Sequence, residues 1–213
     1  MILYHFLNSP FARRVRFAMV LKGISVELRD ARATPENQEA VHCLNPVHTV
    51  PVLVDGDRVI SDSTAICHYL DRKFPEPPLW PAGMAGADAF EFVALTDSVV
   101  HILSDLGMRY HPLHEHPQFP EVRDMFIGRV QRVLDRLAQM VSSRPAGEPL
   151  CGPEWSGADI AVYTLVIWLE GLPARAATFP PAKWVVDLGW SLPQALRTWA
   201  DPHRWREDVL ITG

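Results

Sequence analysis

Short apolar runs alternate with amphipathic segments over the first eighty residues, which is the pattern of alternating strands and helices. Four apolar runs have the length and composition of strands: 2–6, 25–29, 50–54 and 58–60. Three segments have helical periodicity or helix-start signals: 11–22, 35–43 and a segment that opens at 61–63. The last two strands follow each other directly, so a hairpin lies inside an otherwise alternating order. This arrangement predicts a mixed β-sheet with helices.

Turn and capping residues mark the ends of these segments. The break Asn-Ser-Pro at 8–10 precedes the first helix, and Gly23 follows that helix at the position that helix C-termini prefer. Thr34 and Pro35 supply the cap and the first residue of the second helix. Asp-Gly at 55–56 favours a tight hairpin turn. We expect the arginines of the first helix to lie off its apolar face: Arg13, Arg14 and Arg16.

The pattern changes near residue 75. The segment 74–81 contains four prolines in eight residues, which is typical of a linker between domains. Strand signals fade beyond it, and helical periodicity extends over 85–110 and 121–141. We therefore predict an α/β domain, a linker and an all-helical domain, at 1–75, 76–83 and 84–213.

A capping box opens the later half of the helical region. Ser156 is followed three residues later by Asp159, where the motif usually has Glu or Gln, and an apolar run at 160–169 comes next. Prolines interrupt 171–193, where we expect only short helices. One more helix is predicted over 193–200.

Composition limits the classes of protein to which this chain can belong. Hydrophobic residues make up 48% of the 213 residues, enough for a buried core. The net charge is −5 and no segment concentrates Lys and Arg, which disfavours a nucleic-acid partner. The apolar run at 161–169 is too short to cross a membrane, and residues 1–8 carry no signal-peptide pattern. We expect a cytoplasmic protein that binds neither nucleic acid nor membrane.

Neither the cysteines nor the histidines form a recognisable disulfide or metal pattern. The three cysteines are too few and too scattered for either, and we expect Cys43 and Cys67 to be buried, inert thiols. His111, His114 and His116 lie in a short proline-containing stretch, but their spacing matches no strong zinc signature. We expect a solvated loop there and no bound metal.

Three motifs occur in a specific order. Ser-Pro-Phe-Ala at 9–12 lies between the first strand and the first helix, where thioredoxin relatives carry Cys-Pro-x-Cys. Asn-Pro-Val-His-Thr-Val-Pro-Val-Leu at 45–53 is similar to the transferase pattern Asn-Pro-x-Gly-Lys-Val-Pro-x-Leu. Ser-Asp-Ser-Thr-Ala-Ile at 61–66 is similar to Glu-Ser-x-Ala-Ile. Together with the capping box at 156–159, these motifs make the chain resemble the cytosolic glutathione S-transferases, in a bacterial-type form with serine at the thiol-activating position.

The resemblance implies a fold and an activity. The fold is a thioredoxin-like α/β N-terminal domain with a mixed four-stranded sheet, followed by an all-α C-terminal domain that holds the second substrate. The activity is conjugation of glutathione, as cosubstrate, to a small hydrophobic electrophile, usually by a homodimer. Four other activities use the same activated thiol and stay open: peroxidase, disulfide reductase, dehalogenase and isomerase. A non-catalytic role also stays open, because the stringent-starvation regulators carry a Phe-Pro-x-Pro-Pro-Leu-x-Pro segment that resembles 74–81.

The resemblance also places glutathione on two of the motifs. A cis Pro51 turns the backbone of Val50 toward the ligand, so the cysteinyl part of glutathione pairs with it like an added strand. Asp62 and Ser63 stand at a helix N-terminus, where the γ-glutamyl amine and carboxylate are expected to bind. Two further positions of the expected site depart from the family pattern: His48, where glycine is usual, and Thr49, where a longer polar residue is usual.

Ser9 is the candidate for stabilising the glutathione thiolate. Its hydroxyl precedes the first helix, so it can donate to the sulfur while the helix N-terminus adds positive potential. Lowering a thiol pKa by two units takes about 2.7 kcal/mol, which a charge-assisted hydrogen bond supplies with help from the dipole. Tyr4 and His5 are the competitors, since some transferases use a tyrosine near the end of the first strand. We expect Tyr4 in the core and His5 at the strand edge.

The second substrate is expected against the first helices of the helical domain. Phe11 is a candidate apolar wall near the sulfur. Arg13 is a candidate for contact with a carboxylate of glutathione or of the substrate, with a solvated helix face as the favoured alternative. The candidates in the helical domain are His101, Met108 and Arg109, within a wider set that also holds Ser98, Ile102, Asp105 and Tyr110.

Overall fold

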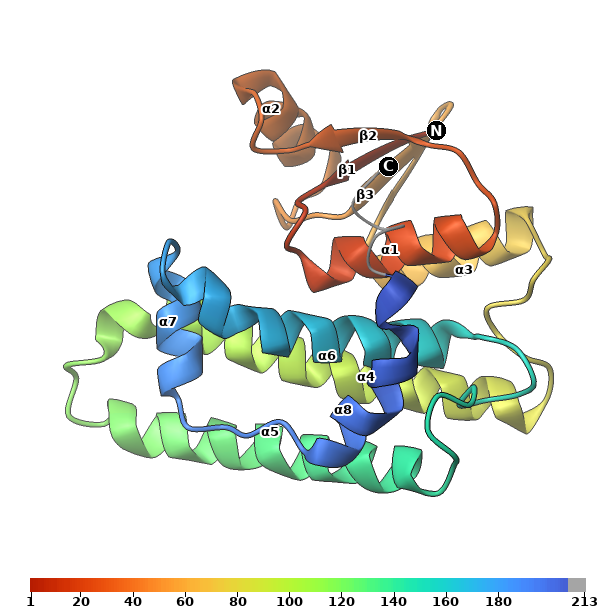
Figure 1. The fold of residues 1–213 in the computed structure, drawn as a ribbon. Helices are drawn as coiled ribbons and strands as arrows, with labels where there is room; N and C mark the ends of the chain where they lie inside the picture. The colour runs from red at the N-terminus through yellow and green to blue at the C-terminus, as the bar shows by residue number, and fades with distance from the viewer. Residues whose placement is uncertain (207–213) are drawn as a thin grey trace.

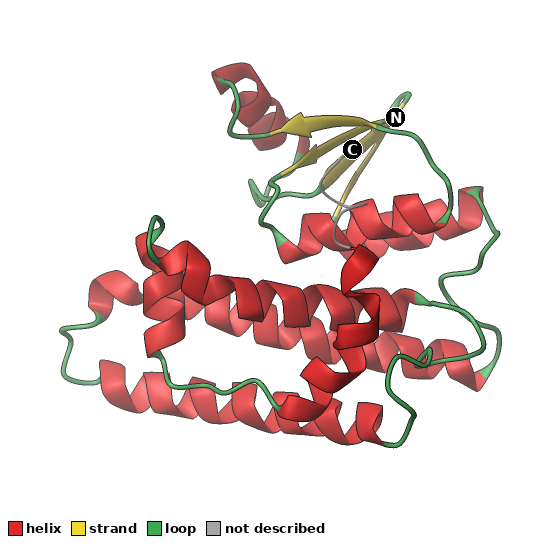
Figure 2. Ribbon diagram, in the orientation of Figure 1, coloured by secondary structure: helices red, strands yellow, loops and turns green. Residues whose placement is uncertain are grey.

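The structure is a computed structural model that describes residues 1–206, and its N-terminal part is a four-stranded sheet with helices (Figure 1, Figure 2). The elements are β1 Ile2–His5, α1 Pro10–Leu21, β2 Glu27–Asp30, α2 Pro35–Leu44, β3 Val52–Asp55, β4 Arg58–Ser61 and α3 Ser63–Lys73. The strands lie in the order β2-β1-β3-β4, with β1 parallel to β2 and antiparallel to β3. The predicted mixed sheet is confirmed, including the hairpin of β3 and β4.

Side chains that alternate along β1 supply both faces of the sheet with core residues. Leu3 packs in the larger hydrophobic core, together with Val15 of α1 and Ile66 of α3. Tyr4 packs in a smaller core with Val41 of α2. Successive strand residues face opposite sides of a sheet, so α1 and α3 cover one face and α2 covers the other (Figure 1). The helical part packs on the side of α1 and α3.

The strand ends differ by one or two residues from the predicted ranges, and two differences concern residues near the site. β3 begins at Val52 rather than at position 50, because Pro51 has no backbone N–H for the sheet ladder. β1 lies inside the sheet, with β2 and β3 on its two sides, so the expectation that His5 lies at a strand edge is wrong. His5 ends β1, is paired with Asp30 of β2 and is buried.

Beyond α3 the described chain is helical, which confirms the α/β plus all-α fold class. The elements are α4 Met84–Ser104, a π-helical turn Asp105–Arg109, a 3-10 turn His111–Leu113, α5 Phe119–Ser142, α6 Gly157–Ala176, α7 Pro180–Asp187, α8 Gln194–Ala200 and a 3-10 turn Asp201–Arg206. The expectation of only short helices over 171–193 is wrong at its start, because α6 continues through Pro173 to Ala176. The proline removes one helical hydrogen bond, but the adjacent Leu172 is buried in the core and holds the last turns in place.

α6 is the central helix of the helical part, and its start carries the predicted capping box (Figure 1). The Asp159 carboxylate accepts hydrogen bonds from the Ser156 N–H at 2.8 Å, from Ser156 Oγ at 2.8 Å and from the Leu150 N–H at 2.7 Å. Ser156 Oγ in turn accepts from the Ala158 N–H at 3.3 Å. Asp159 is fully buried, and this burial raises the pKa of its carboxyl group. The start of α6 is therefore held both by its own first turn and by the loop that contains Leu150.

By length and composition alone, α6 is long and apolar enough to cross a membrane. The apolar residues that flank the run at 161–169 extend it to this length. However, 72% of its most apolar window is buried inside the protein, and the core helix of a globular domain meets the same criterion. α6 packs against α1, α4, α7 and α8, as a core helix does.

The prediction that Cys43 and Cys67 are both buried is half right. Cys67 of α3 is buried, and burial raises the pKa of its thiol to about 12. Cys43 is exposed, and its thiol donates to Glu39 at 3.4 Å, which raises its pKa. The physical reason is that α2 buries only Val41 fully, with Ala40 and Leu44 partly buried, so that Cys43 lies on the outward side of the helix.

Candidate functional site

A cavity of about 610 Å³ lies between the sheet and the helical part. Loops after β1, α2 and β4 form one wall, and α4, α6 and α7 form the other. All residues predicted for thiol activation and glutathione binding line it: Ser9, His48, Thr49, Val50, Pro51, Asp62 and Ser63. Small-molecule sites have volumes of about 300–1,000 Å³. Three segments far apart in the sequence thus meet at a cavity large enough for a small ligand.

Ser9 is the N-cap residue of α1 and is partly buried at the cavity wall. Its Oγ accepts a hydrogen bond from the Ala12 N–H at 3.2 Å, and its own N–H donates to the Phe6 carbonyl at 3.1 Å. Because the capping bond uses a lone pair of Oγ, the hydroxyl hydrogen is left for donation to a ligand. The hydroxyl therefore serves as a cap and has a hydrogen available for donation at the positive end of a helix.

Neither competitor for the role of Ser9 lines the cavity. Tyr4 is buried under α2, and its hydroxyl accepts a hydrogen bond from Arg29 Nη1 at 3.1 Å. His5 is also buried, and burial together with the positive charge of Arg16 lowers its pKa. The expectation that Tyr4 belongs to the core is confirmed.

The side chain of Asn45 shapes the loop before β3. It is 2% exposed, donates from Nδ2 to the Thr49 carbonyl at 2.8 Å, and accepts at Oδ1 from the Val47 N–H at 3.0 Å. Within this turn His48 has φ of 56°, in the left-handed region that favours glycine. This explains why the family pattern has glycine there. The Val50–Pro51 peptide bond is cis, as the resemblance implies.

The N-terminus of α3 presents the other two predicted binding residues. Asp62 is the N-cap, and its Oδ1 accepts from the N–H groups of Thr64 and Ala65, both at 2.9 Å. Capping therefore occupies Oδ1. Within the described residues, no hydrogen bond to Oδ2 of Asp62 is formed. Ser63 is the first helical residue and is only 1% exposed. Both residues line the cavity, with the helix N-terminus beside them.

Arg14 does not line the cavity, but it holds Ser63 in place, a role that the sequence pattern does not reveal. Its Nη1 donates to Ser63 Oγ at 3.2 Å and to Thr64 Oγ1 at 3.3 Å, and its guanidinium pairs with Asp97 of α4. The expectation that the arginines of α1 lie off its buried surface is wrong for Arg14 and Arg16, which are 4% and 5% exposed. The reason is that the sheet covers α1 on one side and α6 covers it on the other (Figure 1).

Replacing Arg14 with methionine is expected to lower the free energy of unfolding by about 2–3 kcal/mol, because the change leaves Asp97 and Ser63 without their buried partner. The free energy of unfolding is measured by urea denaturation. Arg123→Met is the matched control, since Arg123 pairs with Asp124 on the surface of α5 and should change stability by less than about 0.5 kcal/mol. Equal effects of the two changes would show that the Arg14 link between the two parts is dispensable.

The opposite wall of the cavity combines apolar side chains with a few polar ones. Phe11 contacts His101 of α4, with ring centroids 4.8 Å apart, and both line the cavity. Arg109 also lines it and pairs with Asp105 at 2.8 Å. The side chain of Met108 lies outside the described part of the structure. Sequence reasoning misses two α4 residues of this wall, Val100 and Ser104. It also misses all those from α6, α7 and the loop between them: Trp168, Leu172, Arg175, Thr178, Phe179, Pro181, Ala182 and Val185.

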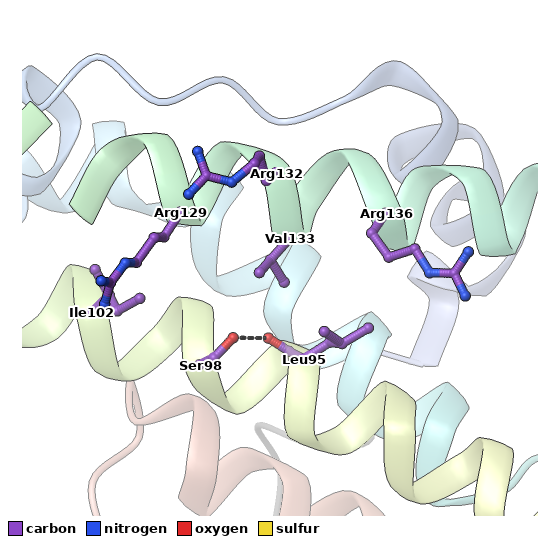
Figure 3. A pocket seen from close by; sticks show the side chains of 7 residues that line it. All are labelled: Leu95, Ser98, Ile102, Arg129, Arg132, Val133 and Arg136. Atoms are coloured by element: carbon purple, nitrogen blue, oxygen red, sulfur yellow. Dashed lines mark hydrogen bonds between the residues drawn. The ribbon is translucent and has the colours of Figure 1, made fainter. Parts of the chain in front are cut away.

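Two residues that were predicted near the second substrate line a different groove. Ser98 and Ile102 line a separate groove of about 430 Å³ between α4 and α5, and Figure 3 shows them opposite three arginines of α5. Ser98 Oγ donates to the Leu95 carbonyl at 2.7 Å. The groove holds none of the residues predicted to bind glutathione, so the prediction is wrong for Ser98 and Ile102. Tyr110 is exposed and lines neither space.

The histidine-rich stretch after the π-helical turn packs on an aromatic ring. His111 stacks on Trp184 of α7, and Nδ1 of His114 lies 2.9 Å from the His111 carbonyl oxygen. Desolvation lowers the pKa of His111. Among residues 1–206, no group of three His, Cys, Asp or Glu side chains is arranged to hold a metal ion.

Two family models match the chain. The model described as glutathione S-transferase, N-terminal domain, matches residues 3–78, and the model described as glutathione S-transferase, C-terminal domain, matches residues 120–205. The first match includes the wall that holds the predicted glutathione-binding residues, and the second includes the α6 and α7 residues of the opposite wall.

Relatives with curated names resemble parts of the chain. Glutathione S-transferase Z1 of Arabidopsis thaliana is 48% identical over 81 residues, which are 37% of this chain and 37% of that protein. A glutathione S-transferase of Triticum aestivum is 43% identical over 139 residues, 63% of this chain and 61% of the relative. A probable maleylacetoacetate isomerase of Vibrio cholerae is 34% identical over 118 residues, 54% of this chain and 51% of the relative. The chain thus spans less than two thirds of the length of each of these relatives.

Solved structures share the fold over nearly the whole chain. A glutathione S-transferase domain-containing protein of Marinobacter aquaeolei superposes with a TM-score of 0.71 at 22% identity, covering 100% of both chains. A glutathione S-transferase of Methylobacillus flagellatus, solved with glutathione bound, superposes with a TM-score of 0.69 at 24% identity, covering 89% of this chain and 99% of the other. At these identities the likeness concerns the fold.

Proposed function

We propose that this chain, which belongs to the glutathione S-transferase family, binds glutathione in the cavity and directs its thiolate at a small hydrophobic electrophile. One observation carries the proposal: the residues predicted on three separate motifs converge on one wall of a single cavity. Glutathione is the cosubstrate of the family, and the Methylobacillus flagellatus relative holds it.

The proposed mechanism gives each segment one part of glutathione. The backbone of Val50 pairs with the cysteinyl residue as an added strand would. Ser63 and the N-terminus of α3 hold the γ-glutamyl carboxylate, and the Asp62 carboxylate takes the amine. Ser9 donates its hydroxyl hydrogen to the sulfur and lowers the thiol pKa, so that the thiolate predominates.

The proposed reaction requires an ionised thiol and two reactants held close together. The thiolate forms a bond to the electrophilic carbon, the leaving group departs with its electron pair, and the thiol proton has already passed to solvent. Holding both reactants in one cavity supplies the entropic part of the acceleration. The apolar lining of Phe11 and Trp168 suits a hydrophobic substrate body.

Calorimetric titration with reduced glutathione tests the binding half of the proposal, and conjugation of 1-chloro-2,4-dinitrobenzene tests the reaction. We expect saturable binding and a conjugation rate above that of glutathione in buffer. A chain that shows no heat of binding and no retention on immobilised glutathione is not a transferase. That result would favour a non-catalytic role. One relative with such a name is a stringent starvation protein A homolog from Coxiella burnetii, which is 37% identical over 81 residues.

A glutathione-dependent isomerase is the second candidate, because one relative is named a probable maleylacetoacetate isomerase. In such a reaction the thiolate adds to a double bond and leaves again after rotation, so glutathione is regenerated. Measuring glutathione consumed per product formed separates the two reactions: conjugation consumes one molecule per turnover and isomerisation consumes none. Formation of oxidised glutathione identifies peroxidase or disulfide-reductase chemistry, and halide released without a stable glutathione conjugate identifies dehalogenation.

We further propose a homodimer with a cytoplasmic location, as is usual for the family. The groove between α4 and α5 in Figure 3, with apolar Leu95 and Val133 and the nearby arginines, is the face that we would examine for a contact with a second copy. Light scattering coupled to size-exclusion chromatography should give twice the 24.0 kDa of one chain. A mass of 24.0 kDa at working concentration excludes the dimer.

A further inference from the structure

Arg175 places a positive charge in the part of the cavity where the second substrate is expected. It lies in the last turns of α6 and lines the cavity together with Leu172 and Phe179. Its Nη1 donates to the Asn8 carbonyl at 3.4 Å, and Asn8 immediately precedes Ser9. The guanidinium therefore stands next to the position proposed for the glutathione sulfur.

The hydrogen bonds of Arg175 leave its charge uncompensated. Besides the bond to Asn8, Nη2 donates to the Trp168 carbonyl at 2.6 Å and Nε donates to the Gly171 carbonyl at 3.2 Å. Within residues 1–206 all three partners are neutral backbone oxygens, and no carboxylate pairs with Arg175. Neutral partners orient a guanidinium, but a bound anion interacts with it about twice as strongly.

The surroundings of Arg175 make the binding of an anion more favourable. Partial burial removes water from the guanidinium, and the neighbouring charge of Arg13 adds repulsion, so that its pKa falls to about 10. The group still carries its full charge at neutral pH. Arg109, which lines the same cavity, differs in this respect because Asp105 neutralises it at 2.8 Å. Arg175 is thus the cation of this wall that a ligand carboxylate stabilises most.

We propose that Arg175 binds a carboxylate of the second substrate, so that the preferred electrophiles have an apolar body and an anionic group. The proposal rests on the glutathione-dependent function proposed above. Phe11, Leu172 and Phe179 contact the apolar body, and the guanidinium fixes the orientation of the reacting carbon relative to Ser9. Arg175 acts here as a specificity-determining residue.

A matched pair of electrophiles tests the proposal: 4-chloro-3,5-dinitrobenzoate and its methyl ester, which share the reacting carbon and the leaving chloride. Each kcat/KM is divided by the rate constant for uncatalysed reaction with glutathione. We expect the corrected ratio of acid to ester to exceed about 10 in the unchanged protein, and to fall by about 10–100-fold in Arg175→Met, because the variant loses more rate on the acid than on the ester. Arg175→Lys should recover part of the ratio, and Arg123→Met on the surface of α5 should not change it.

The outcomes separate this proposal from the function on which it rests. A ratio that is the same in the unchanged protein and in Arg175→Met overturns the role of Arg175, while turnover of the ester keeps the transferase proposal intact. An equal loss on both electrophiles in the variant assigns Arg175 a purely structural role and also overturns the proposal. Turnover of neither electrophile by the unchanged protein contradicts the transferase function itself.

A measurement on the unchanged protein keeps the test independent of whether the variants fold. With the ester as substrate, 4-nitrobenzoate should inhibit at concentrations about 10-fold lower than the uncharged 4-nitrobenzamide. Equal inhibition by the acid and the amide contradicts carboxylate recognition in this cavity.

Discussion

Replacement of Ser9 by alanine is expected to lower kcat/KM for conjugation by about 10–100-fold, because one charge-assisted hydrogen bond to the thiolate is lost. The loss should be largest near neutral pH and should shrink at high pH, where the thiol ionises without help. The pH profile of kcat/KM therefore shifts to a higher apparent pKa in Ser9→Ala. Ultraviolet absorbance of the bound thiolate, titrated against pH, measures the same shift directly.

The capping role of Ser9 has to be separated from its proposed role toward sulfur. Because Ser9 Oγ accepts from the Ala12 N–H, alanine also costs about 1 kcal/mol of stability. Ser9→Asp keeps a capping oxygen but places a negative charge beside the thiolate, so it should fold well and lose more activity than Ser9→Ala. Ser104→Ala, at the same cavity, is the control and should retain most of the activity. An unshifted pH profile in Ser9→Ala removes Ser9 from thiol activation.

Replacement of Asp159 by alanine is expected to lower the free energy of unfolding by about 3–5 kcal/mol. The change leaves three buried donors without an acceptor: the N–H groups of Ser156 and Leu150 and the hydroxyl of Ser156. Each unsatisfied buried group costs about 1–3 kcal/mol, and relaxation of the loop recovers part of that cost. The free energy of unfolding of a native protein is small, so this loss is a large fraction of it. Much of the variant should therefore be unfolded at moderate urea concentrations.

Two further variants sharpen this result. Asp159→Asn keeps one carbonyl acceptor and should fall between the native protein and Asp159→Ala. Asp187→Ala removes an exposed carboxylate that pairs with Lys183 one helical turn earlier, and it should change stability by less than about 0.5 kcal/mol. If Asp159→Ala unfolds at the same urea concentration as Asp187→Ala, the buried capping box does not stabilise α6.

The cap residues and motifs were predictable because each depends on a few neighbouring residues. Thr34 caps α2, Asp62 caps α3 and Ser156 caps α6, as short polar side chains before a helix predict. The hairpin at Asp55 and Gly56 depends on the same kind of local chemistry. Placement of the predicted binding residues at one cavity agrees with the motif order, although their roles stay predictions until ligand binding is measured.

Other features were decided by what each segment packs against. Arg14 is polar and lies on a helix with an apolar face, so its sequence predicts exposure, yet contact with α4 buries it. Cys43 has apolar neighbours, yet it lies on the outward side of α2 and is exposed. Pro173 predicts a helix end, but the core holds α6 together beyond it.

The sequence by itself determined the order of strands and helices, the helix caps and the family motifs, because these follow from periodicity and from contacts within a few residues. Only the tertiary structure decided that Arg14 joins α3 to α4, that neither Tyr4 nor His5 reaches the cavity, and that Arg175 stands beside Ser9. More than 160 positions separate Ser9 from Arg175 along the chain. No local pattern specifies such a contact, because it exists only after both walls of the cavity have packed.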